Sequence, residues 1–328
     1  MNRPPAARLS VDPKDVALAR DLLRESQRIV VTTHRHPDGD AIGSLLGVTV
    51  ALRASQKDVT AHTPNPPPEF LRFLPGFSTI THTVAPLSTV DLALALDHSE
   101  LHRTGLEREL LEGRRPVIAI DHHATADRKA SIAFVVPEAA ATAEILEGLL
   151  PELELLITPE VATCLLTGII TDTGSFQHAN TSTRVLETAA RLVERGADLH
   201  AITAHIFAGR SLSALRIAGR AIERLTVNPE TKMALSVLTK ADLEECGVTA
   251  EDLTGVVNLL NTIPEASFSL LLTEIEEGKI KGSLRSEPEA AVDVSSIAQH
   301  FGGGGHRLAS GFEVAGRLVR DETGWRVE

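Results

Sequence analysis

The chain has 328 residues, 43% of them hydrophobic, a formal net charge of −12 and two cysteines, Cys164 and Cys246. A length of this order favours two domains, and so few cysteines exclude a disulfide framework and a zinc site built on thiolates. The acidic balance without a basic stripe excludes a grip on long nucleic acid, and the lack of a membrane-length apolar run or a signal peptide predicts a cytoplasmic protein with no membrane partner.

The first half of the chain alternates helix and strand signals. Asp12 and Pro13 mark the start of a helix over 13–25. Further on, strands are predicted at 28–33, 58–63, 91–96 and 116–120, and helices at 41–55 and 159–171. The strands are continuous apolar runs, which is typical of a parallel sheet covered on both faces. We therefore predict a doubly wound, mainly parallel α/β domain with its site at the carboxyl ends of the strands.

The second half of the chain predicts a smaller α+β domain. Helical signal continues over 181–225, and the pattern then changes to a strand at 232–239 and a helix from 240. A hairpin of 267–275 with 279–286 follows, then helices at 294–301 and after the glycine run 302–305. We predict a catalytic domain at 1–190, a helical linker at 191–224 and a second domain at 225–328.

Acidic residues and histidines gather where apolar elements end. The stretches are HRHPDGD (34–40), LALDHSE (94–100), IAIDHH (118–123) and IITDTGSF (169–176). Strand ends converge on one edge of a parallel sheet, so these groups can meet in space, and an Asp/His set without thiolates suits manganese, magnesium or iron better than structural zinc. Individually, such an aspartate often caps a helix, Asp121 could orient a histidine, and His36 and His98 could have no role. The fourfold repetition favours a metal site.

The acid clusters also fit a demanding reaction. Hydrolysis of a phosphate ester requires an enzyme to remove on the order of 20 kcal/mol of barrier, and one general acid or base supplies only about 3–5 kcal/mol. Two divalent cations can activate a water and neutralise the phosphoryl oxygens. The sequence therefore indicates phosphoryl chemistry with two metal ions.

The glycine run is the second signal for function. We expect HFGGGGHRLASG (300–311) to open a helix whose backbone N–H groups bind an anion, although a merely flexible loop is the alternative. The candidate substrate-binding residues here are Gly303, Gly304, Gly305, His306 and Arg307, with Arg285 and Ser286 reaching the same anion. Arg103 is a further candidate, and a surface salt bridge is its alternative role.

Five motifs together resemble one known family. HRHPDGDAIGS, LALDHSE, DHH, TDTGSF and GGGGH are similar to the motifs of the DHH phosphoesterase superfamily. Their order and spacing resemble its nanoRNase/pAp phosphatase (oligoribonuclease) branch, with a DHH-associated C-terminal domain, over nearly the whole chain. Inorganic pyrophosphatases of the superfamily carry a different C-terminal signature.

The resemblance implies a site with two Mn²⁺ ions, for which Mg²⁺ or Co²⁺ could substitute. The implied metal ligands are His34, Asp38, Asp40, Asp97, His122 and Asp172, with Asp97 bridging. His123 would contact the scissile phosphate, so Asp97 and His123 are the catalytic candidates. Arg285, Ser286 and His306 would hold the far end of the nucleotide. Gln177, His178 and Glu287 depart from the family pattern and leave the substrate open.

The expected function is therefore a manganese-dependent phosphoesterase. Its partners would be short RNA or DNA oligonucleotides, degraded to mononucleotides in a cleft between the domains, and adenosine 3′,5′-bisphosphate, from which it would remove the 3′-phosphate. The alternatives are a cyclic di-AMP/pApA phosphodiesterase, a RecJ-like single-strand exonuclease and a catalytically silent nucleotide sensor; a homodimer is left open. A Rossmann dehydrogenase is excluded because no Gly-x-Gly-x-x-Gly follows the first strand.

Overall fold

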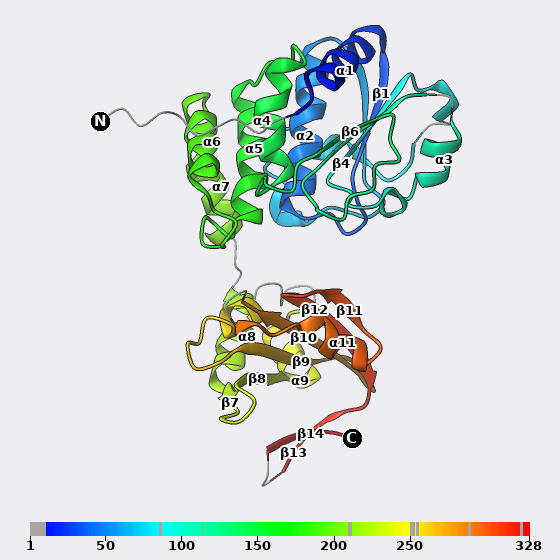
Figure 1. Ribbon diagram of the computed structural model, residues 1–328. Helices are drawn as coiled ribbons and strands as arrows, with labels where there is room; N and C mark the ends of the chain where they lie inside the picture. The colour runs from blue at the N-terminus through cyan, green and yellow to red at the C-terminus, as the bar shows by residue number, and fades with distance from the viewer. Residues whose placement is uncertain are drawn as a thin grey trace. The chain divides into compact units, whose positions relative to one another are not determined.

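The computed structural model divides the chain into two compact units. It describes residues 11–84, 87–113, 115–208, 212–249, 253, 256–287, 290–321 and 324–328. The units are Met1–Gly209 and Arg210–Glu328, so their boundary falls inside the stretch that the sequence suggested as a linker. Figure 1 shows the fold of each unit. Across the described ranges, no helix combines the length and apolar character that crossing a membrane requires.

The first unit is built on a parallel six-stranded sheet. Its strand order is β3-β2-β1-β4-β5-β6. In chain order the strands are β1 (Arg28–Thr32), β2 (Asp58–His62), β3 (Ile80–Thr81), β4 (Leu92–Leu96), β5 (Val117–Asp121) and β6 (Ile132–Val135). Every residue of β4 and β5 is buried, as a sheet covered on both faces requires. The order reverses between β1 and β4, which places the topological switch point at their carboxyl ends.

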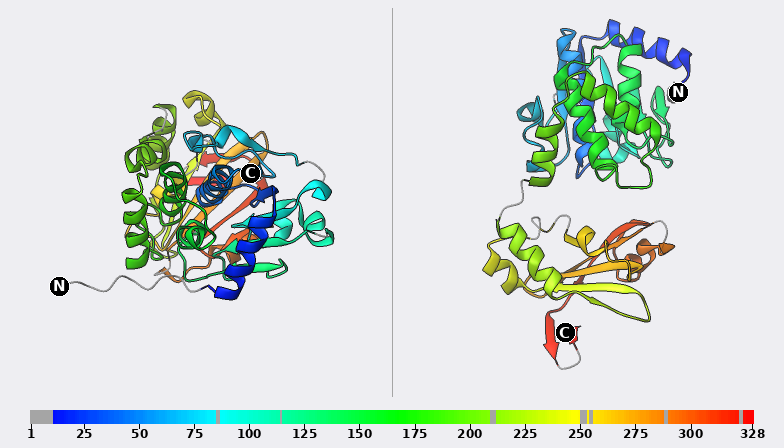
Figure 2. Two further views of the ribbon diagram at one scale, coloured as in Figure 1. Left: turned by 90° about the horizontal axis from the view of Figure 1, so that it is seen from above. Right: turned by 90° about the vertical axis from the view of Figure 1, so that its left-hand side faces the viewer.

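Helices cover both faces of this sheet (Figure 2). The helices of the unit are α1 (Pro13–Glu25), α2 (Gly39–Ala54), α3 (Glu107–Glu112), α4 (Thr142–Glu152), α5 (Pro159–Asp172), α6 (Thr183–Glu194) and α7 (Leu199–Thr203), with a π-helix η5 (Ala204–Ala208) and 3₁₀ turns η1 (Glu69–Leu71), η2 (Phe77–Thr79), η3 (Leu87–Thr89) and η4 (Leu101–Thr104). Helices α1, α2, α4 and α5 share the larger core with one face of the sheet, and η4 and α3 cover the other face through Leu101 and Leu110.

Glycines let α2 and α5 pack unusually close. A Cβ atom added at Gly43 would lie 2.5 Å from the backbone oxygen of Cys164, and one at Gly39 would lie 2.3 Å from the Thr171 side chain. A Cβ at Gly168 would lie 2.6 Å from Oδ1 of Asp40. This crossing holds the start of α2 against the end of α5, beside the strand ends.

The second unit carries a mixed sheet with strand order β11-β12-β10-β9-β8-β7. Its strands are β7 (Thr226–Val227), β8 (Met233–Leu238), β9 (Phe268–Glu276), β10 (Lys279–Ser286), β11 (Gly304–His306) and β12 (Ala309–Ala315), and a separate hairpin pairs β13 (Leu318–Asp321) with β14 (Gly324–Val327). The helices are α8 (Leu212–Glu223), α9 (Lys240–Cys246), α10 (Val256–Leu260) and α11 (Val294–His300). Only β8 and β9 run parallel within the larger sheet.

The predicted doubly wound α/β domain and smaller α+β domain are both confirmed. The helix expected after the glycine run is wrong. That segment is β12, which pairs along its length with β10. Gly305 has a left-handed φ of 141°, and a Cβ there would lie 2.6 Å from the Ala309 backbone oxygen, so glycine lets β11 turn tightly onto β12. An anion site at a helix N-terminus therefore does not exist at this place.

Candidate metal centre

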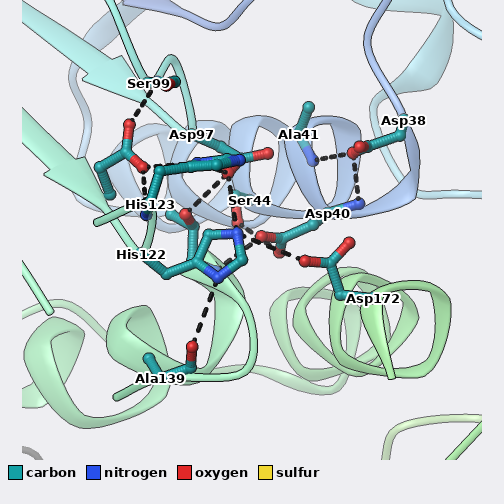
Figure 3. A network of polar contacts seen from close by, with 12 residues as sticks. Asp38, Asp40, Ala41, Ser44, Asp97, Ser99, His122, His123, Ala139 and Asp172 are labelled. Carbon is teal, nitrogen blue, oxygen red and sulfur yellow. Dashed lines mark hydrogen bonds and ion pairs between the residues drawn. The ribbon is translucent and has the colours of Figure 1, made fainter. Parts of the chain in front are cut away.

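Acidic and histidine side chains meet at the carboxyl edge of the parallel sheet (Figure 3). His34 follows β1, Asp97 follows β4, and Asp121 ends β5 directly before His122 and His123. From the helix layer, Asp38 and Asp40 lie at the start of α2, and Asp172 is the last residue of α5. Three groups have ligand atoms within 4.8 Å of one another: His34/Asp38/Asp97, Asp40/His122/Asp172 and Asp97/His122/His123.

Asp97 lies at the centre of the cluster. It is 1% exposed and holds a left-handed φ of 50°, a strained conformation for a residue other than glycine. Its Oδ2 is 3.7 Å from Nε2 of His34, and its Oδ1 is 3.5 Å from Nε2 of His122. Burial alone would raise the pKa of Asp97, but the surrounding imidazoles hold it below its usual value. Asp97 is therefore a carboxylate in the folded protein.

Backbone carbonyls fix the orientation of two imidazoles. Nδ1 of His34 lies 2.8 Å from the backbone oxygen of Arg35, and Nδ1 of His122 lies 3.3 Å from that of Ala139. A carbonyl only accepts, so a proton on Nδ1 satisfies each of these contacts and leaves Nε2 as the atom that can ligate a cation. At His34 the Arg103 guanidinium, which only donates, competes for the same Nδ1 at 3.2 Å. Both Nε2 atoms face the carboxylates, which is the arrangement that metal-ligating histidines have.

Asp40 and Asp172 repel each other and the neighbouring acids. Asp40 is fully buried and accepts hydrogen bonds from the backbone N–H groups of Thr142 (2.6 Å) and Ala143 (3.0 Å), the first residues of α4. Even so, burial and then the charges of Asp97 and Asp38 raise the pKa of Asp40 well above its usual value. The pKa of Asp172 is raised in the same way by burial and by Asp40. Carboxylates this close are ionised together more easily when a positive charge lies between them, and a divalent cation would supply it.

His123 is held differently from the other two histidines. Its Nδ1 is 2.8 Å from Oδ1 of Asp121, which also accepts the His123 backbone N–H at 2.8 Å. Burial would lower the pKa of His123, but the hydrogen bond to Asp121 raises it. Nδ1 of His123 is thus bonded to Asp121, and it also lies 3.6 Å from Oδ1 of Asp97. Nε2 is the ring nitrogen that remains for another partner.

The structure bears on the alternative roles considered for His98 and for Arg103. His98 does not face solvent: it is fully buried, with Nδ1 3.0 Å from Oδ2 of Asp121. Arg103 is half-buried, and in the described ranges no carboxylate oxygen lies within 4.0 Å of its guanidinium, so the surface salt bridge is absent there. Its Nη2 instead lies 3.2 Å from Nδ1 of His34.

The residues predicted for substrate binding in the second unit lie around β10 and β11. Arg285 is partly buried, its Nη1 donates to the Leu284 backbone oxygen, and burial lowers the pKa of its guanidinium. Ser286 is buried and its hydroxyl donates to the Ser267 oxygen at 3.3 Å. Gly303 precedes β11, whereas Gly304 and Gly305 lie in it, and Arg307 is exposed directly after it. The side chain of His306 lies outside the described part of the chain.

Sequence reasoning missed the groups that hold the acids in place. Ser44 donates to Asp40 at 3.2 Å, and the Thr142 hydroxyl donates to Asp97 at 3.1 Å. No local motif marks Thr142, because its role depends on α4 meeting the strand ends. The four-residue spacing of Gly39, Gly43 and Gly47 is the signal that would have revealed the α2–α5 crossing.

Comparison with known proteins agrees with this geometry. Residues 28–169 match the DHH family, N-terminal domain, and residues 230–322 match the DHHA1 domain. The "Bifunctional oligoribonuclease and PAP phosphatase NrnA" of Thermus thermophilus is 37% identical over 289 residues, which cover 88% of this chain and 84% of that relative. The chain belongs to the DHH family.

A second curated protein and a solved structure are also similar to this DHH protein over most of its length. The "Cyclic-di-AMP phosphodiesterase PdeA" of Listeria monocytogenes is 26% identical over 88% of this chain and 45% of that protein. The solved structure of an exopolyphosphatase-related protein from Bacteroides fragilis superposes with a TM-score of 0.85 at 29% identity, covering 92% of each chain. The DHH protein is thus a hydrolase of the phosphoesterase class, and the Asp/His cluster is its candidate metal site.

Proposed function

We propose that this protein hydrolyses very short oligonucleotides to mononucleotides with two Mn²⁺ ions, and also removes the 3′-phosphate of adenosine 3′,5′-bisphosphate. The observation that carries the proposal is the set of three metal-capable groups, two of which contain Asp97 and two of which contain His122. Shared ligands are what two adjacent ions need. The Thermus relative, whose name gives both activities, supports the choice of substrates.

The atoms that face one another support the ligand assignment that the family resemblance implies. His34 and Asp38 would hold one ion, Asp97 would bridge, and a second group would hold the other ion: Asp40, His122 and Asp172. Divalent ions bound there would supply an activated water and charge neutralisation at the phosphoryl oxygens. The orientation of the His34 and His122 rings by backbone carbonyls and the crowded carboxylates support this fit.

His123 is the proposed proton donor. Its raised pKa keeps the ring protonated further into the neutral range, and its free Nε2 can donate to the leaving oxygen. Asp121 would orient the ring through Nδ1, and its own pKa, which burial would raise, is held low by hydrogen bonds from His123 and His98. An ionised Asp121 favours a charged imidazole beside it.

In the second unit, we propose that Arg285, Ser286 and Arg307, with the glycines of β11 and with His306, bind the end of the nucleotide away from the reaction. The partly buried Arg285 supports this, because a guanidinium in a desolvated setting binds phosphate or carboxylate groups tightly. Arg285→Ala should raise KM for nucleotides while leaving bound Mn²⁺ unchanged. A parallel loss of Mn²⁺ would contradict this role.

A turnover panel tests the proposal. Purified protein with Mn²⁺ is given RNA of two to twenty nucleotides, the corresponding DNA, adenosine bisphosphate, cyclic di-AMP and pyrophosphate. We expect the highest kcat/KM with dinucleotides to tetranucleotides and a decline with length, because the protein carries a net charge of −12. Equal rates at twenty and at two nucleotides would favour the RecJ-like exonuclease instead.

A cyclic di-AMP phosphodiesterase is the second candidate. The similarity to the Listeria protein favours it, although this chain spans only 45% of that protein. In the same panel, faster turnover of cyclic di-AMP than of linear dinucleotides would establish this function and displace the first.

A further inference from the structure

Two arginines stand side by side at the edge of the metal centre. Arg35 directly follows His34, and its backbone N–H donates to the backbone oxygen of Arg103 at 2.7 Å. This bond joins the loop after β1 to η4 after β4. Arg103 Nη2 lies 3.2 Å from His34 Nδ1, so it is one imidazole ring away from the carboxylate cluster.

Neither guanidinium is neutralised by an acid. Within the described ranges, no carboxylate oxygen lies within 4.0 Å of the side chain of Arg35 or Arg103. The chain has 44 acidic and 32 basic residues, so two arginines that are joined through their backbones and have no carboxylate partner among the described residues are positioned for an anion from outside the protein.

The Arg35 side chain is also oriented. Its Nη2 lies 3.4 Å from Nε2 of His102, whose Nδ1 lies 3.2 Å from the Glu100 carboxylate. If Nδ1 donates to Glu100, Nε2 is the acceptor for Arg35. These two contacts orient the exposed Arg35 guanidinium without neutralising its charge.

We infer that Arg35 is a specificity-determining residue, and that with Arg103 it binds a second phosphate next to the one that is hydrolysed. The inference rests on the proposed function, because it assumes that the scissile phosphate lies at the Nε2 side of His34. The Arg103 guanidinium lies at the Nδ1 side of the same ring, and the Arg35 backbone is hydrogen-bonded to Arg103, so the two arginines would contact a neighbouring phosphate. The ligand class is thus a nucleotide with at least two phosphates.

The test compares ligands that differ in one phosphate. Binding of 5′-ADP and 5′-AMP to the Mn²⁺-loaded full chain is measured by calorimetry for the wild type, Arg35→Gln and Arg35→Lys. We expect the wild type to bind ADP at least ~10-fold more tightly than AMP, since charge-assisted hydrogen bonds to phosphate are worth this much. Arg35→Gln should lose most of that ratio and leave AMP within about twofold, and Arg35→Lys should retain part of it.

The matched control is Arg108→Gln, an exposed arginine on α3 that pairs with Glu112 at 3.1 Å and should change neither affinity. Equal weakening of AMP and ADP by Arg35→Gln, or an unchanged ADP affinity, would overturn the inference. Neither ligand contains a phosphodiester. A protein that releases no mononucleotide from oligonucleotides yet shows the Arg35-dependent ADP preference would therefore refute the proposed function and leave the second-phosphate subsite standing.

Discussion

Gly168→Ala should disrupt the candidate metal centre, because Gly168 on α5 packs directly against Asp40 on α2. The added methyl carbon would lie 2.6 Å from Oδ1 of Asp40 and 2.8 Å from the Ala143 side chain. Both neighbours are fixed, because Ala143 N–H donates to that same Oδ1 at 3.0 Å. Either α5 moves away or the Asp40 carboxylate leaves its donors.

The cost can be worked from these contacts. Overpacking a tight core costs about 1–3 kcal/mol, and disturbing hydrogen bonds to the Asp40 carboxylate costs about 1.5–3 kcal/mol. The better helix propensity of alanine returns about 1 kcal/mol. The net loss is about 1.5–5 kcal/mol of unfolding free energy, which lowers Tm by roughly 3–20 °C for a unit of this size.

Gly148→Ala is the matched control, since Gly148 lies in α4 of the same unit and a Cβ there meets no atom within 4 Å. It should stabilise the fold by about 0.5–1 kcal/mol. Thermal and urea unfolding followed by circular dichroism, with Mn²⁺ titration by calorimetry, separate the two variants. If Gly168→Ala binds Mn²⁺ as the wild type does, the crossing does not position Asp40 and the reasoning is refuted.

Three further results are expected. Asp97→Asn should bind less Mn²⁺ and lose at least ~10³-fold in kcat, measured by metal analysis and dinucleotide turnover; wild-type turnover would remove Asp97 from the site. Mn²⁺ affinity should fall as pH decreases, by ~10-fold per pH unit for each proton displaced, because Asp40 and Asp172, whose pKa values are raised, hold protons that the metal must displace. Calorimetry in two buffers of different ionisation enthalpy counts the protons released. Release of no protons would contradict the raised pKa values. Asp121→Asn should lower kcat by ~10²–10⁴-fold with little change in metal content, because His123 loses the partner that orients it, whereas equal loss of metal would assign Asp121 to the metal site.

Local signals predicted the elements that place the site. The apolar runs of β1, β4 and β5 and the caps at Asp12 and Thr158 gave the strands and helices of the first unit within a few residues. Because parallel strands share a carboxyl edge, the acids after β1 and β4 were expected to meet, and they do.

The misses share a physical cause, namely that long-range pairing decides them. The residues after the glycine run form β12 because β10 offers a partner strand, and no local propensity records that pairing. The strand β6 and the helix α4 were not predicted either, although α4 supplies the N–H groups that bind Asp40. The substrate-binding residues of the second unit remain predictions for another reason, which is that their role depends on a ligand rather than on contacts within the chain.

Hydrogen bonds and imidazole contacts within the fold hold three of the four clustered carboxylates in place. Asp38 accepts N–H groups at the start of α2, and Asp40 accepts those at the start of α4, so two helix termini stabilise them. Asp97 lies among imidazoles. For Asp172, within the described ranges, no hydrogen bond reaches the carboxylate, and Nε2 of His122 lies 3.4 Å from its Oδ2. The repulsion is therefore concentrated in Asp40 and Asp172, the acids whose pKa values are raised well above the usual range, and a bound cation would relieve it by displacing their protons.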